Sequence, residues 1–446
     1  MKATYYSIAA ALLLLSACKP TIQGEAPTKG NADFSNYVAI GNSLTAGYAD
    51  GTLYRSGQLN SYPNMLAQQF KLVGGGNFKQ PLLPGNFGWP GAKRVLGSTL
   101  SCDGTTGLGP VLYNGPADTA GSSTNISAQG PFNNLGVPGI RCIDYTLAGY
   151  GAIAQVLGGV GYAARMYPNP LTDKPVDIAA RSNATFFTLW LGNNDVLGYA
   201  TGGGEGNGKG GGQPADISPL ITFEASYRTV VDTMTAHGAK GVLINLPDVT
   251  SIPFFTTIPA MGLVLTRQGQ ADSLTAAYAM AGLNFKFNVG ANPFIIQDTS
   301  APGGMRPIKN GEYILLTTPQ DSIKCRGWGS KKPIPKRYVL DATEVSNVQT
   351  ATANFNNVIA TVAKEKGLPL VNANAYLKTL QSGIKFNGLT FTPAFVTGGA
   401  FSLDGVHLTP RGYALMANEI IRVINSYYGA TIPSVDITKY NGVLFP

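Results

Sequence analysis

Apolar residues along the chain gather in five short runs that end in glycine, proline or a polar turn. Most of these runs are rich in β-branched and aromatic residues and lack a strict alternation of apolar and polar positions. Such runs are typical of strands that are buried on both faces of a parallel sheet. We therefore predict strands over residues 37–40, 131–139, 184–191, 241–246 and 368–372.

Other stretches repeat apolar residues at every third or fourth position, as amphipathic helices do. The last of them has the clearest limits, with Thr409 as N-cap, Pro410 in the first turn and Gly429 after the end. Because helices alternate with strands, we predict an α/β domain in which helices cover both faces of a parallel sheet. The predicted helices cover residues 62–72, 142–157, 219–237, 343–366 and 410–428.

Two long segments interrupt this alternation, at about residues 50–129 and 250–337. Both contain many glycines and prolines, and we interpret them as large insertions, the first of which walls one side of a cleft. A third tract, residues 202–212, is mostly glycine and fits phosphate-loop templates only in part, because Gly210 replaces the required Ser or Thr. We interpret this tract as a flexible loop near the carboxyl edge of the sheet.

The first residues indicate a targeting segment rather than part of the fold. Lys2 precedes an apolar run over residues 8–15 that is too short to span a bilayer. The run ends in Leu15-Ser16-Ala17-Cys18, which resembles the bacterial lipobox, in which the cysteine is lipidated and becomes the mature N-terminus. A plain secretory cleavage site is the alternative.

This interpretation sets the domain organisation and the expected location. We expect a signal peptide over residues 1–17, a lipidated tether over 18–34 and one domain over 35–446. Cys18 would anchor the protein to a membrane of the bacterial cell envelope, as an outer-membrane lipoprotein.

Three cysteines remain when Cys18 is set aside, which permits one disulfide and one free thiol in an oxidising compartment. Cys102 and Cys142 both lie in the early half of the chain, so we favour a bond between them over one to Cys325. The spacing of the cysteines matches no zinc motif.

Composition limits the classes of function. Of the 446 residues, 44% are hydrophobic and 13% charged, which supports a large core and excludes global disorder. The net charge is +8, but the cations are scattered and their densest group is the proline-broken segment 331–337. We interpret that segment first as a solvated loop, second as a contact with an anionic envelope surface, and only third as a nucleic-acid contact. We expect a monomer that binds no nucleic acid.

The segment from Tyr37 to Gly47 carries the main indication of chemistry. A predicted strand stops at Gly41, which permits a sharp turn, and Ser43 follows at the start of a helix. Free backbone N–H groups and the positive end of the helix dipole suit a nucleophile whose reaction creates an oxyanion. A serine that only caps the helix is the alternative interpretation.

A serine nucleophile needs a base, and the chain has only two histidines. His237 lies at the end of a predicted helix with no acid near it in sequence, which favours a structural role. Asp404 precedes His407 by three residues in a turn before the last helix. That spacing lets one carboxylate reach the imidazole Nδ1 while Nε2 faces outward.

Four blocks of the chain, in this order, resemble the motifs of the GDSL, or SGNH, hydrolase family. They are Gly41-Asn42-Ser43-Leu44, the Gly136 block at residues 134–139, Gly192-Asn193-Asn194-Asp195, and Asp404-Gly405-Val406-His407. The resemblance covers most of residues 36–429, outside the two insertions. Asn42 departs from the family, which usually has Asp there, but an amide can also accept and donate locally, so we expect the turn to survive.

The resemblance implies a three-layer αβα, flavodoxin-like fold with its site at the carboxyl ends of the strands. It implies that Ser43 is the nucleophile, His407 the base and Asp404 its orienting acid. The oxyanion donors would be the Ser43 and Gly136 backbone N–H groups and the Asn194 side chain. Core-turn roles for Gly136 and Asn194 are the alternative, and we expect no cofactor and no metal.

The same resemblance implies hydrolysis of carboxylic esters through an acyl-serine intermediate. The α/β-hydrolases place Ser, Asp and His in the same order, but their G-x-S-x-G motif fails here at Thr45. Acyl lipids, including lysophospholipids, and acetylated glycans are the expected substrates. The alternatives are a non-catalytic surface lipoprotein that binds glycan or protein through the same cleft, and a structural role in the envelope.

Overall fold

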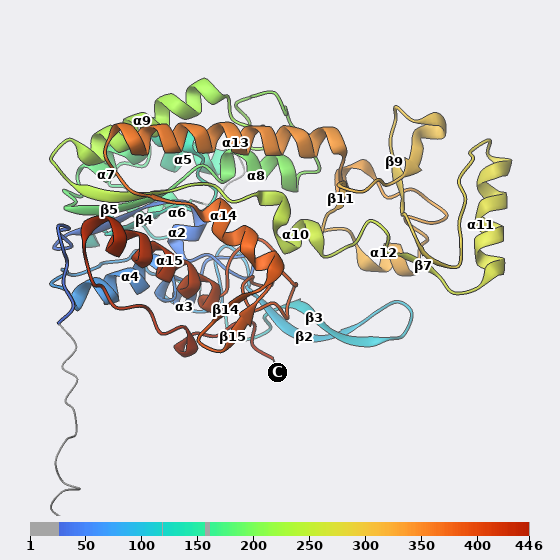
Figure 1. Cartoon of the computed structure of the whole chain (residues 1–446), viewed down its shortest axis with the longest axis horizontal. Coiled ribbons are helices and arrows are strands. Elements are labelled where there is room, and N and C mark those ends of the chain that lie inside the picture. The colour runs from blue at the N-terminus through green and yellow to red at the C-terminus, as the bar shows by residue number, and fades with distance from the viewer. Residues whose placement is uncertain (1–25, 118, 157–160, 446) are drawn as a thin grey trace, which may run out of the picture.

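A five-stranded parallel sheet forms the centre of the computed structural model, which describes residues 26–117, 119–156 and 161–445 (Figure 1). The strand order is β13-β6-β5-β1-β4, and every neighbouring pair is parallel. The strands are β1 (Tyr37–Gly41), β4 (Asn134–Gly136), β5 (Phe186–Trp190), β6 (Lys240–Ile244) and β13 (Leu370–Val371). The predicted parallel sheet is confirmed, whereas the predicted signal peptide, Cys18 and the first part of the tether lie outside the described residues.

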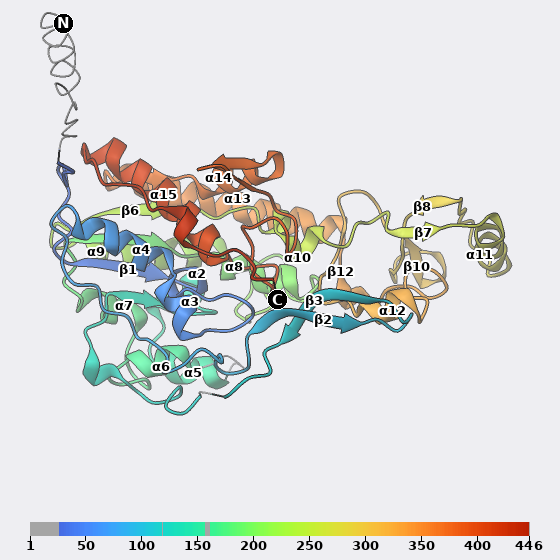
Figure 2. The same cartoon turned by 90° about the horizontal axis from the view of Figure 1, so that it is seen from below.

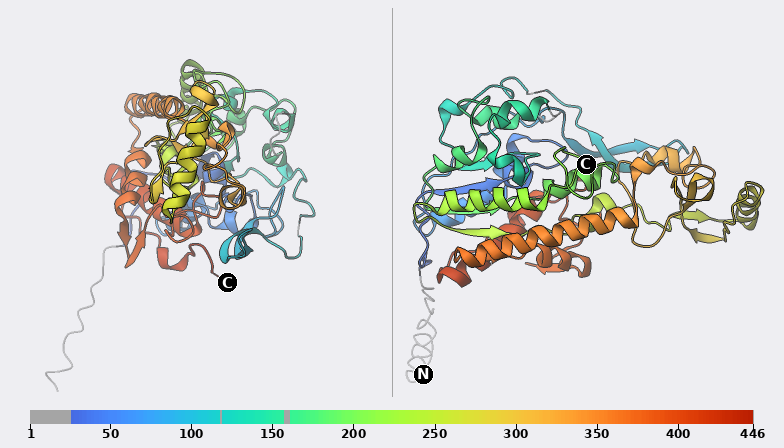
Figure 3. Two further views of the ribbon diagram at one scale, coloured as in Figure 1. Left: turned by 90° about the vertical axis from the view of Figure 1, so that its right-hand side faces the viewer. Right: turned by 90° about the horizontal axis from the view of Figure 1, so that it is seen from above.

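Helices cover both faces of the sheet, so the domain has three layers (Figures 1 and 3). Every residue of β1 and β5 is buried, which explains why these strands read as continuous apolar runs. Helices α9 and α13 lie side by side on one face, and α4 packs against α15 on the other. The helices on the first face are α7 (Pro175–Ala180), α8 (Asn194–Thr201), α9 (Leu220–Thr235) and α13 (Ala342–Glu365), and those on the second are α4 (Tyr62–Lys71) and α15 (Pro410–Tyr428).

Local signals explain where α15 begins and ends. The Thr409 side chain accepts a hydrogen bond from the Gly412 N–H, and Gly429 ends the helix in the left-handed conformation, as predicted. The helix predicted over 142–157 is wrong in its length. A 3₁₀ turn, Cys142–Thr146, and helix α5 (Tyr150–Val156) replace it, because Gly149 adopts a positive φ of 73° between them.

The first predicted insertion contains both core and projecting elements. Helix α4 belongs to the layer under the sheet, where Tyr62, Met65 and Leu66 are fully buried, so it is not part of an insertion. The hairpin of β2 (Arg94–Leu100) and β3 (Thr106–Leu112) projects beyond the sheet (Figure 2). The other helices of the amino-terminal half are α2 (Ser43–Ala46), α3 (Arg55–Leu59) and α6 (Tyr162–Met166).

The second predicted insertion forms an arm that extends away from the sheet (Figure 1). The arm has two small hydrophobic clusters of its own, one around Phe294 and Ile314 and one around Leu274 and Phe287. Its elements are β7 (Leu263–Leu265), α11 (Gln268–Met280), β8 (Gly290–Asn292), β9 (Ile295–Gln297), β10 (Met305–Pro307), β11 (Tyr313–Ile314) and α12 (Gln320–Lys324). Helix α10 (Pro253–Thr256) lies at the start of the same predicted insertion, before the arm itself. Strand β12 (Val339–Leu340) follows the arm, and α14 (Ala373–Lys378), β14 (Ile384–Phe386) and β15 (Leu389–Phe391) lie nearer the carboxyl end of the chain.

A disulfide between Cys102 and Cys325 joins the hairpin to the arm. The predicted bond between Cys102 and Cys142 is therefore wrong. Cys142 is free and fully buried beneath α9, where its thiol contacts the Phe223 carbonyl oxygen at 3.6 Å. Proximity in sequence misled the prediction, because the hairpin carries Cys102 away from the core and toward the arm.

The glycine-rich tract 202–212 is a loop, as predicted, but its backbone is tied to its neighbours. The Gly211 N–H donates to the Ile217 carbonyl, and Arg141 Nη1 donates to the Gly212 carbonyl at 2.9 Å. Lys336, from the basic segment 331–337, donates to the Gly203 carbonyl and pairs with Glu344 at 2.6 Å. These contacts argue for a held loop rather than a freely moving one.

The described end of the predicted tether is part of the packed domain. The Asn31 N–H donates to the Tyr428 carbonyl at the end of α15, and the Thr431 N–H donates to the Thr28 carbonyl. Phe34 is 1% exposed and stacks on Phe70, with ring centroids 4.0 Å apart. The folded domain therefore begins before residue 35.

Replacement of Phe34 tests this boundary. We expect Phe34→Ala to lower the free energy of unfolding by about 3–5 kcal/mol, because it leaves a cavity against Phe70. Chemical denaturation followed by intrinsic fluorescence measures the change. Lys29→Ala, at an exposed position of the same segment, should stay within about 0.5 kcal/mol of wild type, and equal effects of both changes would contradict the assignment.

Candidate active site

Ser43 follows the carboxyl end of β1, at the edge of the sheet where the parallel strands end. Strand β1 lies between β4 and β5, and Gly41 is level with Gly136 on one side and Trp190 on the other. A Cβ at Gly41 would lie 2.5 Å from the Trp190 carbonyl oxygen, so close packing, rather than a positive φ, requires glycine here. Ser43 follows as the first residue of α2 and is 7% exposed.

Asn42 organises the turn that presents Ser43. Its Oδ1 accepts from the Leu44 N–H at 3.1 Å, so Asn42 is the N-cap and the interpretation of Ser43 as a cap is wrong. Its Nδ2 donates to Asn193 Oδ1 at 3.1 Å, which links the ends of β1 and β5. The turn thus survives with Asn in place of the family's usual Asp. Across the described ranges, the Ser43 N–H has no hydrogen-bond acceptor.

The fold brings Ser43, His407 and Asp404 together across 364 residues of sequence. His407 Nε2 lies 2.8 Å from Ser43 Oγ, and His407 Nδ1 lies 2.8 Å from Asp404 Oδ2. The side chains of His407 and Asp404 are 13% and 10% exposed. This geometry allows Nδ1 to donate to the carboxylate while Nε2 accepts the serine proton.

Hydrogen-bond donors surround the Asp404 carboxylate. Oδ1 accepts from the backbone N–H groups of Val406 and His407 and from the Ser402 hydroxyl, and Oδ2 also accepts from the Gly51 N–H at 3.0 Å. Burial alone would raise the pKa of Asp404, but the charge of His407 and these hydrogen bonds hold it well below its usual range. The carboxylate therefore stays ionised and orients His407.

Gly136 does not offer a free donor to the site. Its N–H donates to Asn134 Oδ1 at 3.0 Å, and a side chain there would clash with the backbone of Thr45 and Ala46. The predicted oxyanion role of its N–H is therefore not available, and Gly136 instead allows β4 to approach α2. Gly139 follows in the next turn, with a φ of 84°.

Asn194 faces the pocket that contains Ser43, as the first residue of α8. Its Nδ2 donates one hydrogen to the Ile140 carbonyl at 2.9 Å, which holds the amide in place. An amide nitrogen carries two hydrogens, and in the described part of the chain no second acceptor lies near this one. The other hydrogen is therefore available to an oxygen bound beside Ser43.

The pocket at Ser43 is small and mostly apolar. Its space is about 40 Å³, enough for about three water molecules at roughly 10–15 Å³ each. The polar residues that line it are Asn42, Ser43, Asn193, Asn194 and His407. The apolar side chains that line it include Leu197, Val249, Ile252, Leu377, Phe401 and Val406.

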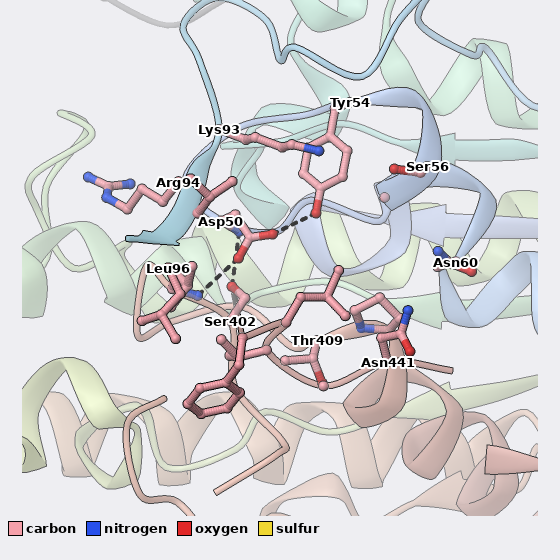
Figure 4. A pocket seen from close by; sticks show the side chains of 18 residues that line it. Asp50, Tyr54, Ser56, Asn60, Lys93, Arg94, Leu96, Ser402, Thr409 and Asn441 are labelled. Atoms are coloured by element: carbon pink, nitrogen blue, oxygen red, sulfur yellow. Dashed lines mark hydrogen bonds between the residues drawn. The ribbon is translucent and has the colours of Figure 1, made fainter. Parts of the chain in front are cut away.

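Asp50 forms hydrogen bonds next to the triad and was not predicted from the sequence; Figure 4 shows it beside Tyr54 and Ser402. It adopts a positive φ of 55°, and its carboxylate accepts from the Tyr54 hydroxyl at 2.6 Å and the Leu403 N–H at 3.0 Å. Its own N–H donates to the Ser402 hydroxyl, which in turn donates to Asp404. Burial raises the pKa of Asp50. An Asp before Gly51 in a loop is too common a pattern to reveal this role.

His237 takes no part in the site, since it is exposed in the turn after α9. Within the ranges that the structure describes, no three His, Cys, Asp or Glu side chains converge as metal ligands would. No described helix combines the length and apolar character needed to cross a bilayer.

Comparison with known proteins agrees with this arrangement. No curated protein sequence matches the chain. The family model described as GDSL-like Lipase/Acylhydrolase matches residues 37–420, which include Ser43, Asn194, Asp404 and His407. Because the match covers most of the chain, the protein belongs to the GDSL-like lipase/acylhydrolase family of hydrolases.

Proposed function

We propose that the protein hydrolyses carboxylic esters through an acyl intermediate on Ser43. The observation that carries this proposal is the pair of 2.8 Å contacts from His407, one to Ser43 and one to Asp404. Membership of the acylhydrolase family supports an ester as the substrate. We expect the protein to act as a monomer.

The geometry supports the usual two-step reaction. His407 Nε2 takes the proton of Ser43 Oγ as the oxygen attacks the ester carbonyl, and then gives that proton to the departing alcohol. A water molecule, activated by the same nitrogen, then attacks the acyl-serine and releases the acid. Asp404 keeps His407 in the required tautomer and stabilises the imidazolium that forms in each step.

The oxyanion donors in this proposal are the Ser43 N–H, the Asn194 amide and the Gly139 N–H. The Gly139 N–H replaces that of Gly136, which Asn134 already occupies. Gly139 is exposed, and its N–H has no acceptor among the residues described here. Its turn also adjoins Asn194 through the Ile140 carbonyl. Loss of one oxyanion donor typically lowers kcat about 10²–10³-fold.

The small apolar pocket favours esters of short acyl groups. Its 40 Å³ accommodate an acetyl or similar group, which makes acetylated glycans better candidates than long-chain acyl lipids. We further propose that Cys18 is lipidated and anchors the enzyme in the bacterial cell envelope, at the outer membrane. The leader sequence supports this location.

Removal of the Ser43 hydroxyl tests catalysis directly. Ser43→Ala should lower p-nitrophenyl acetate turnover by at least about 10⁴-fold and abolish labelling by a fluorophosphonate probe, because no nucleophile remains. Ser273→Ala, at an exposed position on α11, serves as the matched control and should behave as wild type. If wild type neither turns over the ester nor takes the probe, the non-catalytic binding protein becomes the better account.

Asp404→Asn tests the orienting carboxylate. The carboxylate accepts hydrogen bonds with both of its oxygens, whereas an amide can accept with only one. His407 would therefore adopt the wrong tautomer, and kcat should fall about 10³–10⁴-fold.

The contribution of Asp404 to the free energy of unfolding should depend on pH. Because the folded pKa is lowered, ionised Asp404 stabilises the fold fully above about pH 4 and less as the pH falls further. The difference in unfolding free energy between wild type and variant should therefore shrink below about pH 4, and a constant difference would contradict this.

A series of p-nitrophenyl esters tests the acyl preference. We expect kcat/KM for the acetate or butyrate to exceed that for the palmitate by at least about tenfold, because the pocket has room for only a few atoms. Leu377→Ala should reduce this ratio by enlarging the pocket. A wild-type preference for palmitate would refute the short-acyl assignment.

A further inference from the structure

The β2–β3 hairpin presents one apolar face to solvent. Its register pairs Leu96 with Pro110, Ser98 with Leu108, Leu100 with Thr106 and Arg94 with Leu112. Since side chains alternate between the two faces of a strand, all these residues share one face. We call this surface the leucine face and define it by Leu96, Leu100, Leu108, Pro110 and Leu112.

Most side chains of the leucine face are exposed to solvent rather than packed against the domain. Leu100, Leu108 and Leu112 are 75%, 57% and 65% exposed, whereas Leu96, at the root, is 7% exposed. Single exposed leucines are common, but several on one face of a projecting hairpin indicate an interaction surface. A two-stranded hairpin is also barely stable alone, so this one depends on its attachments at either end.

The root of the leucine face continues into a pocket of about 420 Å³ (Figure 4). Leu96 and Tyr54 line this pocket together with Leu444 and Phe445, which are 67% and 59% exposed. The pocket is separate from the one at Ser43 and about ten times larger. Apolar surface therefore extends from the hairpin to the carboxyl-terminal segment of the described chain.

Two cations stand beside this apolar surface. Lys93 Nζ lies 4.6 Å above the Tyr54 ring and 5.5 Å above the Tyr113 ring, and Arg94 is exposed on the leucine face itself. In the described ranges no carboxylate lies within 4 Å of either cation, and burial lowers the pKa of Lys93. Asp50, whose charge acts on Lys93, is already held by Tyr54 and the Leu403 N–H.

We propose that the leucine face and its adjoining pocket dock the protein on a lipid surface that carries anionic headgroups. Leu100, Leu108 and Leu112 would enter the boundary between headgroups and acyl chains, and Arg94 would meet the phosphates. Lys93 lines the adjoining pocket and would add positive charge there. A second copy of the chain fits less well. A symmetric contact would bring the exposed Arg94 of both copies onto one apolar surface, and no residue of the leucine face offers a carboxylate to pair with it.

The hairpin also connects this surface to the catalytic residues. At its root, the Arg94 N–H donates to the Asp50 carbonyl, and the next residue, Gly51, donates to Asp404 at 3.0 Å. At its tip, the disulfide from Cys102 and a contact of Lys324 Nζ with Ser101 Oγ fix it to the arm. A docked hairpin would therefore hold the active site at a set position over the lipid surface.

Vesicle co-sedimentation tests the proposal with an unlipidated form that begins at residue 19 and keeps every described residue. The vesicles contain phosphatidylglycerol and phosphatidylcholine in equal parts, or phosphatidylcholine alone. Leu100→Ser combined with Leu108→Ser should weaken binding to the anionic vesicles at least about tenfold. Val264→Ser combined with Met280→Ser, at positions 63% and 85% exposed on the arm, is the matched control and should bind like wild type.

A second pair of changes tests the charge. Lys93→Gln combined with Arg94→Gln should remove the preference for anionic over neutral vesicles and leave the thermal unfolding midpoint within a few degrees of wild type. The assay measures binding alone, so its result does not depend on whether Ser43 is catalytic. The proposal is overturned if wild type ignores anionic vesicles or if the leucine variant binds them normally. It is also overturned if gel filtration shows wild type as a dimer that the leucine variant splits.

Discussion

The hydrogen bond between His407 and Ser43 depends on how the two ends of the domain meet. Ser43 comes from the first strand of the chain and His407 from the loop before its last long helix. Helix α15 packs on α4, and its Tyr413 hydroxyl donates to the carbonyl of Tyr48, five residues after Ser43, the first residue of α2. Loosening of α15 from this face would therefore move His407 away from Ser43.

Asp404 connects the hydrogen-bonded pair of His407 and Ser43 to the first insertion. Its carboxylate is held not only by its own turn but also by Gly51 and, through Ser402, by Asp50. Asp50 adopts a positive φ, an unfavourable conformation for a residue with a side chain, and its four hydrogen bonds offset that strain. The loop that follows α2 is therefore a structural part of the catalytic apparatus.

The sequence predicted those features that depend on local pattern. Buried strands read as continuous apolar runs, and the serine and the Asp–His pair followed from short blocks and from the scarcity of histidines. Two features that depend on partners distant in sequence were predicted wrongly or not at all: Cys102 pairs with Cys325, and Phe34 stacks on Phe70. The error at Gly136 is local, because Asn134, two residues earlier, accepts its N–H, and the sequence does not reveal which rotamer an asparagine adopts.

The hairpin of the first insertion is attached both to the active-site loop and to the arm of the second insertion. We call the hairpin with these two attachments the frame. The hairpin is fixed at its root by backbone contacts to Asp50 and at its tip by the disulfide to the arm. A ribbon held at both ends resists bending better than one held only at its root, so its exposed leucines keep a constant position relative to Ser43. A surface meant only to shield the site would bury those leucines against the domain. Because they face solvent instead, the frame is better suited to position the site against an external surface than to close over it.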